Sequence, residues 1–237
     1  MTLDDEQSNY LLRVLRLGAE AEVRAFNGRD GEWVTALAAA GKRASLIPVR
    51  RSRAQPPAPS PSLALLFAPV KKDQTDLIVE KATELGASVV WPVLTHRTQT
   101  RTVRLDRLRK IALEAAEQTE RLDLPEVREA ALLDIALAGL PEGTSIVFCD
   151  EAGDEEGAPW GGEAGRAGPM LQVLQGLKGR HAAILTGPEG GFTPEERAYL
   201  RSRPDTFAVG LGPRILRAET AAVAAMTLWQ AVCGDWG

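Results

Sequence analysis

The residues of this chain that could do chemistry lie first in a glycine-rich stretch, ILTGPEGGFTPEE, at positions 184–196. An apolar, strand-like run leads into glycines and then into a helix start. Thr193 is suited to be the N-cap, Pro194 fits the first helical turn, and Glu196 completes a capping box with Thr193. Such a loop leaves a strand at the carboxyl edge of a parallel sheet, where α/β proteins bind ligands, and glycines let a ligand approach the backbone. The sequence therefore predicts a ligand loop, with a tight connection that binds nothing as the alternative. Because the lysine of a phosphate-binding P-loop is missing, a P-loop is not expected.

A second stretch, GLGPRILRAETA at positions 210–221, has the same character. It begins with two glycines in a Gly-x-Gly arrangement, but Ile215 stands where a dinucleotide fingerprint has its third glycine, so NAD is disfavoured. Arg214, Arg217 and Thr220 are spaced three apart, which would place them on one stripe of a helix predicted over 214–233. The alternative is a solvated, charged turn before a core helix.

A third stretch, EAAEQTER at positions 114–121, follows a basic region of the chain. Glu114, Gln118 and Arg121 are predicted to share one face of a helix over about 105–119. That face could hold a polar substrate or be ordinary wet surface.

Charge is distributed unevenly along the 237 residues, whose formal net charge is −4. The stretch 42–55 has five basic residues and no acid, and 97–110 has six basic residues against Asp106 alone. The stretch 150–163 instead has six acids. The basic stretches permit a polyanionic partner, although solvated surface is the commoner explanation.

Several other classes of protein are disfavoured. No apolar run approaches the roughly 18 residues of a membrane span, and the first residues are acidic, so a cytosolic protein is expected. Cys149 and Cys233 are far apart and are expected to be buried thiols rather than disulfide or zinc ligands. His96 and His181 lie in no nucleophile or metal motif and are expected to be structural, and no metal site is indicated.

The elements that must position these residues fall into two groups separated by a proline-rich linker at 53–61. Before it, strands at 21–27, 32–38 and 45–50, with a turn at 28–31, predict a small β domain over 1–52. After it, strands alternate with helices over 62–237, which is typical of a parallel sheet covered by helices. The strands expected in this second part are 63–69, 88–94, 145–149, 182–186 and 206–210.

The helices predicted in the second domain have recognisable ends. One runs over 74–85, with Asp73 as N-cap and Gly86 as the stop. The last, over 214–233, is apolar on nearly every side and should be enclosed by the fold or by another subunit. The acidic, glycine-rich stretch 150–168 is expected to be a mobile surface loop.

Taken together, these blocks resemble a known family. The segments KATELG at 81–86, GPEGGF at 187–192 and LGPRILRAETA at 211–221, with EQTER at 117–121 and LRVLRL at 12–17, are similar to signature blocks of the RsmE family of 16S ribosomal RNA (uracil-N3) methyltransferases. The match extends over nearly the whole chain in order.

The resemblance implies a fold, a cofactor and partners. It implies an α/β SPOUT domain with a C-terminal trefoil knot, preceded by a PUA-like β-barrel that binds RNA and lacks the family's first strand. It also implies a homodimer, S-adenosylmethionine as methyl donor, and 16S ribosomal RNA of the small ribosomal subunit as substrate. No membrane partner is expected.

The resemblance further implies roles for particular residues. Transfer to N3 of a uridine requires removal of its proton, and an arginine could stabilise the negative charge that then develops on the ring carbonyls. Arg121 or Arg217 is expected in that role, with Glu189 orienting an arginine or receiving the proton. The cofactor contacts expected are Leu185, Thr186, Gly187, Pro188, Glu189, Gly190, Gly191, Leu211, Gly212, Arg214, Ile215, Leu216 and Thr220. The RNA contacts expected are Arg13, Arg16, Arg50, Arg51, Arg97, Arg101, Gln118 and Arg121.

Two other functions stay open on the sequence alone. A nucleotide-binding oxidoreductase would need affinity for NAD. A ribosome-assembly protein that binds RNA without catalysis would keep the basic stretches but would not need the two glycine loops.

Overall fold

The computed structural model describes residues 1–41, 43–150 and 167–236. The chain forms two compact units. The small unit consists of Met1–Pro57 and Glu120–Asp123, and the large unit of Ala58–Thr119 and Leu124–Gly237. Each unit has its own apolar core.

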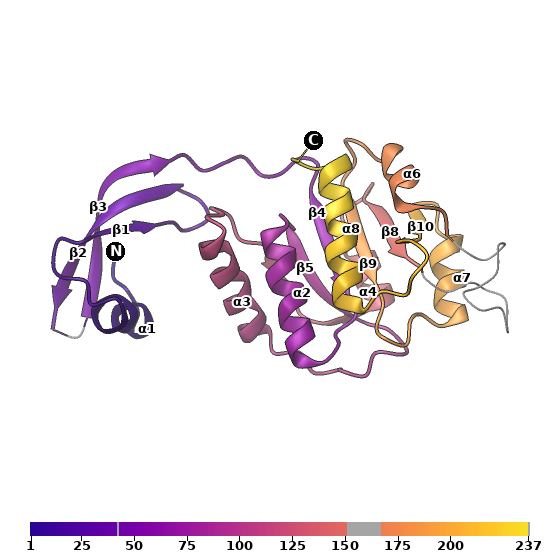
Figure 1. Ribbon diagram of the computed structural model, residues 1–237, viewed down its shortest axis with the longest axis horizontal. Coiled ribbons are helices and arrows are strands. Elements are labelled where there is room, and N and C mark those ends of the chain that lie inside the picture. The colour runs from indigo at the N-terminus through magenta and orange to yellow at the C-terminus, as the bar shows by residue number, and fades with distance from the viewer. Residues whose placement is uncertain (42, 151–166, 237) are drawn as a thin grey trace. The chain divides into compact units, whose positions relative to one another are not determined.

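The small unit is built on a three-stranded antiparallel sheet in the order β1-β2-β3, which confirms the three predicted strands (Figure 1). Its strands are β1 (Glu22–Ala25), β2 (Glu32–Ala40) and β3 (Arg43–Arg53). Two short helices that were not predicted precede the sheet, α1 (Asp5–Asn9) and the π-helix η1 (Tyr10–Val14). A capping box between Asp4 and Gln7, a signal present in the sequence, begins α1.

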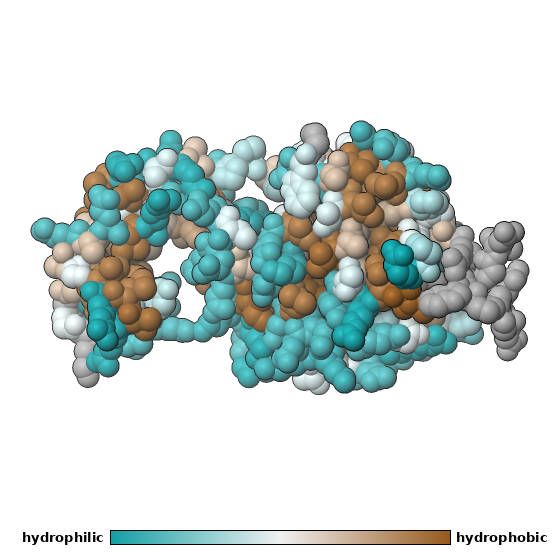
Figure 2. Space-filling model, in the orientation of Figure 1, coloured by the Kyte–Doolittle hydropathy of each residue, from teal (hydrophilic) through white to brown (hydrophobic). Residues whose placement is uncertain are grey.

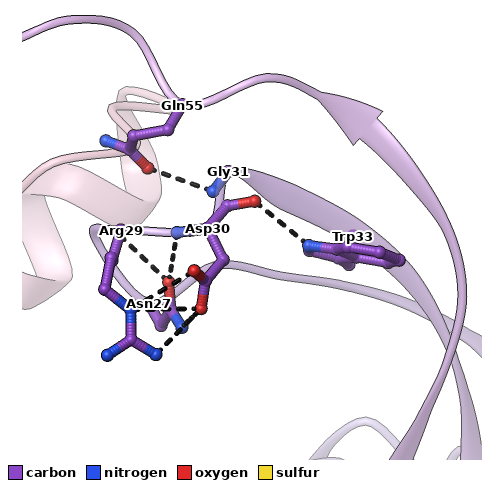
Figure 3. A network of polar contacts seen from close by, with 6 residues as sticks. All are labelled: Asn27, Arg29, Asp30, Gly31, Trp33 and Gln55. Atoms are coloured by element: carbon purple, nitrogen blue, oxygen red, sulfur yellow. Dashed lines mark hydrogen bonds and ion pairs between the residues drawn. The ribbon is translucent and has the colours of Figure 1, made fainter.

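The turn between β1 and β2 is held by its own side chains (Figure 3). The Asn27 side-chain oxygen accepts the backbone N–H groups of Arg29 and Asp30 at 3.0 and 2.9 Å. The next residue, Gly31, has a φ of +81°, and a Cβ there would lie 2.4 Å from a backbone oxygen of Arg53. The Gln55 side chain accepts the Gly31 N–H at 3.2 Å. The turn therefore requires glycine at this position.

The segment Glu120–Asp123 belongs to the small unit although it follows a helix of the large one. Arg53 donates to the Glu120 carbonyl oxygen at 3.2 Å, and Gln55 donates to the Leu122 carbonyl oxygen at 3.4 Å. Such pairing between residues about seventy positions apart in sequence leaves no local pattern to read.

The large unit contains a parallel sheet of seven strands. Along the sheet the order is β10-β8-β9-β4-β5-β6, and β7 pairs with β5. The strands are β4 (Leu63–Phe67), β5 (Val89–Leu94), β6 (Glu126–Val127), β7 (Ala131–Leu132), β8 (Ser145–Cys149), β9 (Ala182–Thr186) and β10 (Thr206–Val209). The five predicted strands are confirmed, and the short β6 and β7 are the strands of the described residues that were missed. The coarse fold prediction, a parallel α/β sheet after a small β domain, is thereby confirmed.

Helices cover both faces of this sheet. Alternate residues of β4 enter different cores: Leu63, Leu65 and Phe67 pack with α2, α3, α6 and α8, while Ala64 and Leu66 pack with α4 and α7. Strands buried on both faces are continuously apolar, as β4, β8 and β9 are. The helices are α2 (Lys72–Glu84), α3 (Leu105–Gln118), α4 (Leu133–Ala138), α6 (Met170–Gln175), α7 (Pro194–Ser202) and α8 (Ala218–Val232).

The start of α2 differs from the prediction, whereas the predicted stop at Gly86 is confirmed. Lys71 is the N-cap without a side-chain hydrogen bond, so the assignment of Asp73 as N-cap was wrong. Asp73 lies in the first turn, where a carboxylate also suits the helix dipole. Gly86 stops the helix with a φ of +81°, and Ala87 N–H donates to the Ala82 carbonyl oxygen as in a Schellman motif.

The predicted start of α8, at residue 214, was also wrong, by four residues. The helix begins at Ala218, with the extended Arg217 as its N-cap. Much of α8 is buried, and Ala225, Met226 and Trp229 are at most 1% exposed, in agreement with an enclosed helix. Residues 214–217 therefore belong to the preceding loop.

Candidate functional site

The first glycine stretch leaves the interior of the sheet, as predicted. It follows β9, which is entirely buried and is paired with β4 on one side and β8 on the other. The predicted start of α7 is confirmed. Thr193 Oγ1 accepts the Glu196 N–H at 3.2 Å, and the Glu196 carboxylate accepts the Thr193 N–H at 2.9 Å.

Within this loop the glycines have different surroundings. A Cβ on Gly187 would lie 2.7 Å from the ring of Phe192, which is 6% exposed. That ring packs edge-on against Phe148, with centroids 4.8 Å apart. Gly191 adopts a φ of +64° and donates its N–H to the Pro188 carbonyl oxygen at 2.8 Å. Gly187 is thus required by packing and Gly191 favoured by backbone conformation.

The turn 95–98, which follows β5, holds the outer part of the glycine loop. An Arg97 guanidinium nitrogen donates to the carbonyl oxygens of Gly190 at 2.8 Å and Phe192 at 3.3 Å. The His96 N–H donates to the Glu196 carboxylate at 2.8 Å. Arg97 was expected to contact RNA, and no local sequence pattern predicts these hydrogen bonds between residues about ninety positions apart.

The second glycine stretch leaves the same edge of the sheet after β10, with β8 between β10 and β9. Gly210 pairs with the segment before α6, since its N–H donates to the Gly168 carbonyl oxygen and its own oxygen accepts the Met170 N–H. Gly212 has a φ of +109°. In this loop Ile215 is 62% exposed.

The stripe predicted for Arg214, Arg217 and Thr220 is wrong, because the first two precede α8. All three side chains are exposed. The glycine and proline of this segment permit a loop that carries Arg214 and Arg217 outside helical geometry. The two loops nevertheless share one sheet edge.

A buried hydroxyl marks the same edge. Thr186, the last residue of β9, is 1% exposed, and among the described residues its Oγ1 has no hydrogen-bond partner. An unpaired buried hydroxyl is costly unless a ligand or water satisfies it. Together with the open glycine loops, this atom fits the binding of a polar molecule.

Asp150, which directly follows β8, was expected to lie on the surface as the first residue of a loop, and its expected exposure was wrong. Asp150 is 4% exposed and accepts from Arg197 at 2.9 and 3.2 Å and from Arg201 at 2.6 Å. Charges this buried require partners, and both arginines come from α7. Residues 151–166 of the predicted mobile stretch lie outside the described residues, and its last residue, Gly168, accepts the Gly210 N–H.

The third stretch does not form the predicted face. Glu114 and Gln118 are exposed on α3, but the helix ends at Gln118, and Arg121 lies beyond it in the small unit. The Arg121 side chain is 11% exposed and donates twice to Asp123, at 3.0 and 2.7 Å. This hydrogen bonding holds the pKa of Asp123 below its usual value. Burial, with the nearby Glu114 adding to it, raises the pKa of Glu117.

The other expected contacts are on the surface of their units. Arg13, Arg16, Arg50 and Arg51 are exposed in the small unit, and Arg101 is exposed in the large one. Among the described residues, no group of three His, Cys, Asp or Glu side chains could hold a metal ion. No helix in the described part of the chain is long and apolar enough to cross a membrane. Both cysteines are buried thiols, as expected.

The fold and the two loops define a class of protein: a parallel α/β domain with two glycine-rich loops at the carboxyl edge of its sheet, the edge where α/β proteins bind ligands, joined to a small β domain. A family model described as RNA methyltransferase domain matches residues 57–230. A second, described as RNA methyltransferase PUA domain, matches residues 3–47.

Similar proteins and solved structures belong to the same class. Ribosomal RNA small subunit methyltransferase E of Rickettsia conorii is 33% identical, over 94% of this chain and 85% of its own length. The Synechocystis protein of the same name is also 33% identical, over 95% and 71%. The crystal structure of a Ribosomal RNA small subunit methyltransferase E from Neisseria gonorrhoeae bound to S-adenosyl methionine has a TM-score of 0.78 at 26% identity, covering 100% of this chain and 93% of that one. This chain belongs to the ribosomal RNA small subunit methyltransferase E family, which confirms the resemblance drawn from its motifs.

Proposed function

We propose that the protein transfers a methyl group from S-adenosylmethionine to N3 of a uridine in 16S ribosomal RNA of the small subunit. The observation that carries this proposal is the pair of glycine loops at one sheet edge, beside the unpaired Thr186 hydroxyl. The relatives' names support the rRNA substrate, and the Neisseria structure supports the donor.

The donor would be held mainly by backbone groups and apolar contacts. Ile215 is exposed and Leu211 and Leu216 are half-buried, so they offer an apolar surface to a nucleoside base. Thr186 Oγ1 would gain a hydrogen bond. The proposed donor contacts are Leu185, Thr186, Gly187, Pro188, Glu189, Gly190, Gly191, Leu211, Gly212, Arg214, Ile215, Leu216 and Thr220.

S-adenosylmethionine supplies an electrophilic methyl group when bound. The protein must then align the uridine and stabilise the charge that develops once the N3 proton leaves. Two arginines are candidates for that stabilising role. Arg217 is exposed at the start of α8, whereas Arg121 is largely buried against Asp123, which favours Arg217. Glu189 is exposed in the first loop and would orient the arginine or accept the proton.

RNA would be bound by exposed basic residues of both units together with Gln118. The proposed contacts are Arg13, Arg16, Arg50, Arg51, Arg97, Arg101, Gln118 and Arg121, with Arg97 and Arg121 also engaged inside the protein. Since ribosomal RNA is the substrate, the reaction would take place in the cytoplasm.

Two finer features of the family complete the proposal. The first is a trefoil knot in the C-terminal part of the large unit, for which the family resemblance is the support. The second is a homodimer. On the face shown in Figure 2, apolar side chains reach the surface over α6 and along α8. Leu171 of α6 is 49% exposed, and Leu228 of α8 is half-buried. A second copy would cover such a surface.

Equilibrium dialysis of the purified protein against labelled S-adenosylmethionine and, separately, NAD tests the donor assignment. Saturable binding of S-adenosylmethionine and none of NAD is expected. Binding of NAD alone would favour an oxidoreductase, and binding of neither would favour an RNA-binding protein without catalysis. Sedimentation tests the dimer, and a fully active monomer at micromolar concentration would contradict it.

A further inference from the structure

We infer that Arg97 is a positioning residue, which fixes the glycine loop 187–192 in the conformation that the methyl donor requires. This inference rests on the proposed function, because it takes that loop to bind the donor. The sequence expectation for Arg97 was an RNA contact, but its hydrogen bonds are made within the protein.

The geometry of the contact is specific to the loop's bend. A single Arg97 nitrogen donates to the carbonyl oxygens of Gly190 at 2.8 Å and Phe192 at 3.3 Å. These carbonyls flank Gly191, the residue with a φ of +64°. A Cβ on Gly190 would lie 3.5 Å from both Cβ and Cδ of Arg97, so the loop backbone also rests on the aliphatic part of that side chain. Arg97 therefore stabilises both the bend and the loop's distance from β5.

The turn that carries Arg97 is itself rigidly held. Thr95 and Thr98 are 3% and 4% exposed, and the Thr98 hydroxyl accepts the Thr95 N–H at 2.9 Å. The Thr98 N–H in turn donates to the Thr95 carbonyl oxygen at 3.2 Å. Between them, the His96 N–H binds Glu196, the capping-box residue of α7. One turn thus restrains both the bend of the glycine loop and the start of the helix that follows.

The position of this turn in the sheet explains why the glycine loop needs the restraint that Arg97 provides. The turn follows β5 and the loop follows β9, with β4 between the two strands. Glu189 and Gly190 are exposed, so the tip of the loop has little packing of its own to restrain it. A loop that is ordered before binding loses less conformational entropy when the donor arrives. The expected role of Arg97 is to lower that cost.

The experiment combines hydrogen exchange of the loop amides without ligand and donor affinity by titration calorimetry. The variants are Arg97→Ala, the conservative Arg97→Lys, and Arg109→Ala as a control that removes an exposed arginine of α3. Arg97→Ala should speed exchange at Gly191 and Phe192 and weaken S-adenosylmethionine binding by about tenfold, the effect of losing one charge-assisted hydrogen-bond set. Arg97→Lys should restore part of both effects, and Arg109→Ala should change neither.

The outcomes separate this inference from the proposed function. If the wild-type protein binds no S-adenosylmethionine, the proposed function and the role of Arg97 in donor binding both fail, even if hydrogen exchange shows that Arg97 restrains the loop. If the wild type binds the donor and Arg97→Ala binds it equally well, the positioning role is overturned while the function stands. Should Arg97→Ala fail to fold, Arg97→Gln replaces it, and unchanged donor affinity in that variant has the same meaning.

Discussion

Gln230, near the end of α8, donates its side-chain N–H to the backbone carbonyl oxygen of Leu85 at 2.6 Å. Leu85 is the C-cap of α2, so a side chain of the last helix satisfies the end of the first helix of the large unit. Gln230 is 3% exposed, and a Cβ on Gly86 would lie 2.6 Å from its amide nitrogen. The glycine of the KATELG block thus leaves room for this contact.

Replacing Gln230 by methionine should destabilise the protein by about 1–3 kcal/mol, because the partly buried Leu85 carbonyl loses its donor while side-chain volume is nearly kept. Urea unfolding measures the change. Ala231→Gln, at the exposed neighbouring position, should shift stability by no more than about 0.5 kcal/mol. Equal effects of the two substitutions would show that the contact contributes nothing specific.

Gly187 and Gly190 of the first glycine loop should respond differently to an added side chain. Gly187→Ala forces a Cβ against Phe192 and should cost about 1–3 kcal/mol of stability, as overpacking does. Gly190→Val meets only ordinary contacts with Arg97 at its Cβ, so the protein should fold and lose donor affinity by about tenfold or more. Thermal unfolding and donor titration of both variants check this. Unchanged donor affinity in a folded Gly190→Val protein would mean that the loop has been wrongly assigned.

The sequence predicts best where local patterns decide the structure. The capping box of Thr193 and Glu196 and the stop at Gly86 are local signals, and both are confirmed. The start of α8 was wrong because the three-residue spacing of Arg214, Arg217 and Thr220 imitates a helix stripe where the chain is a loop.

Contacts between distant parts of the chain left no pattern to read. From the sequence, Asp150 was expected to be the first residue of an acidic surface stretch. Its ion-pair partners, Arg197 and Arg201, lie in α7, and no local pattern indicates them. Arg97 looked like one more residue of a basic stretch, although its partners lie more than ninety positions away. A single sequence shows charge and spacing, but not which distant backbone a guanidinium meets.

The free energy of unfolding of the small unit should fall at acid pH, because the Glu32 carboxylate becomes protonated. Hydrogen bonds from Arg53 and then Ser52 hold the pKa of this buried carboxyl below its usual value. The unfolded state therefore binds a proton first as the pH falls. This stabilisation is fully present above the ordinary glutamate pKa of about 4.3 and is lost as the pH falls through the lower, folded value.

Hydrogen-exchange protection of β2 and β3 measures that dependence. The stability difference between the wild-type protein and Glu32→Gln should be larger at pH 7 than at pH 3. Glu22→Gln, an exposed change in β1, is the matched control and should show a smaller dependence. A difference that is independent of pH for Glu32→Gln would contradict the assigned cause.

Arg217→Ala should lower turnover by about 10²–10³, as the loss of a charge-stabilising group does, while donor affinity changes little. Arg121→Ala should lower turnover less, because Arg121 is bound to Asp123. Single-turnover rates at saturating donor and RNA compare the two variants. Arg180→Ala, at a position outside the proposed site, is the control. A larger loss for Arg121→Ala would reverse the assignment between the two arginines.

Methylation of uridine N3 in the small ribosomal subunit can be tested with a single assay. The protein is incubated with tritiated S-adenosylmethionine and assembled small subunits, naked 16S ribosomal RNA, or a short uridine-containing oligomer, followed by nucleoside mass spectrometry. We expect N3-methyluridine, formed fastest on the assembled subunit and more slowly as salt rises, since phosphate contacts release counterions. Label at uracil C5 or on a ribose hydroxyl would contradict the proposed chemistry, and equal rates on oligomer and subunit would contradict recognition of a structured RNA.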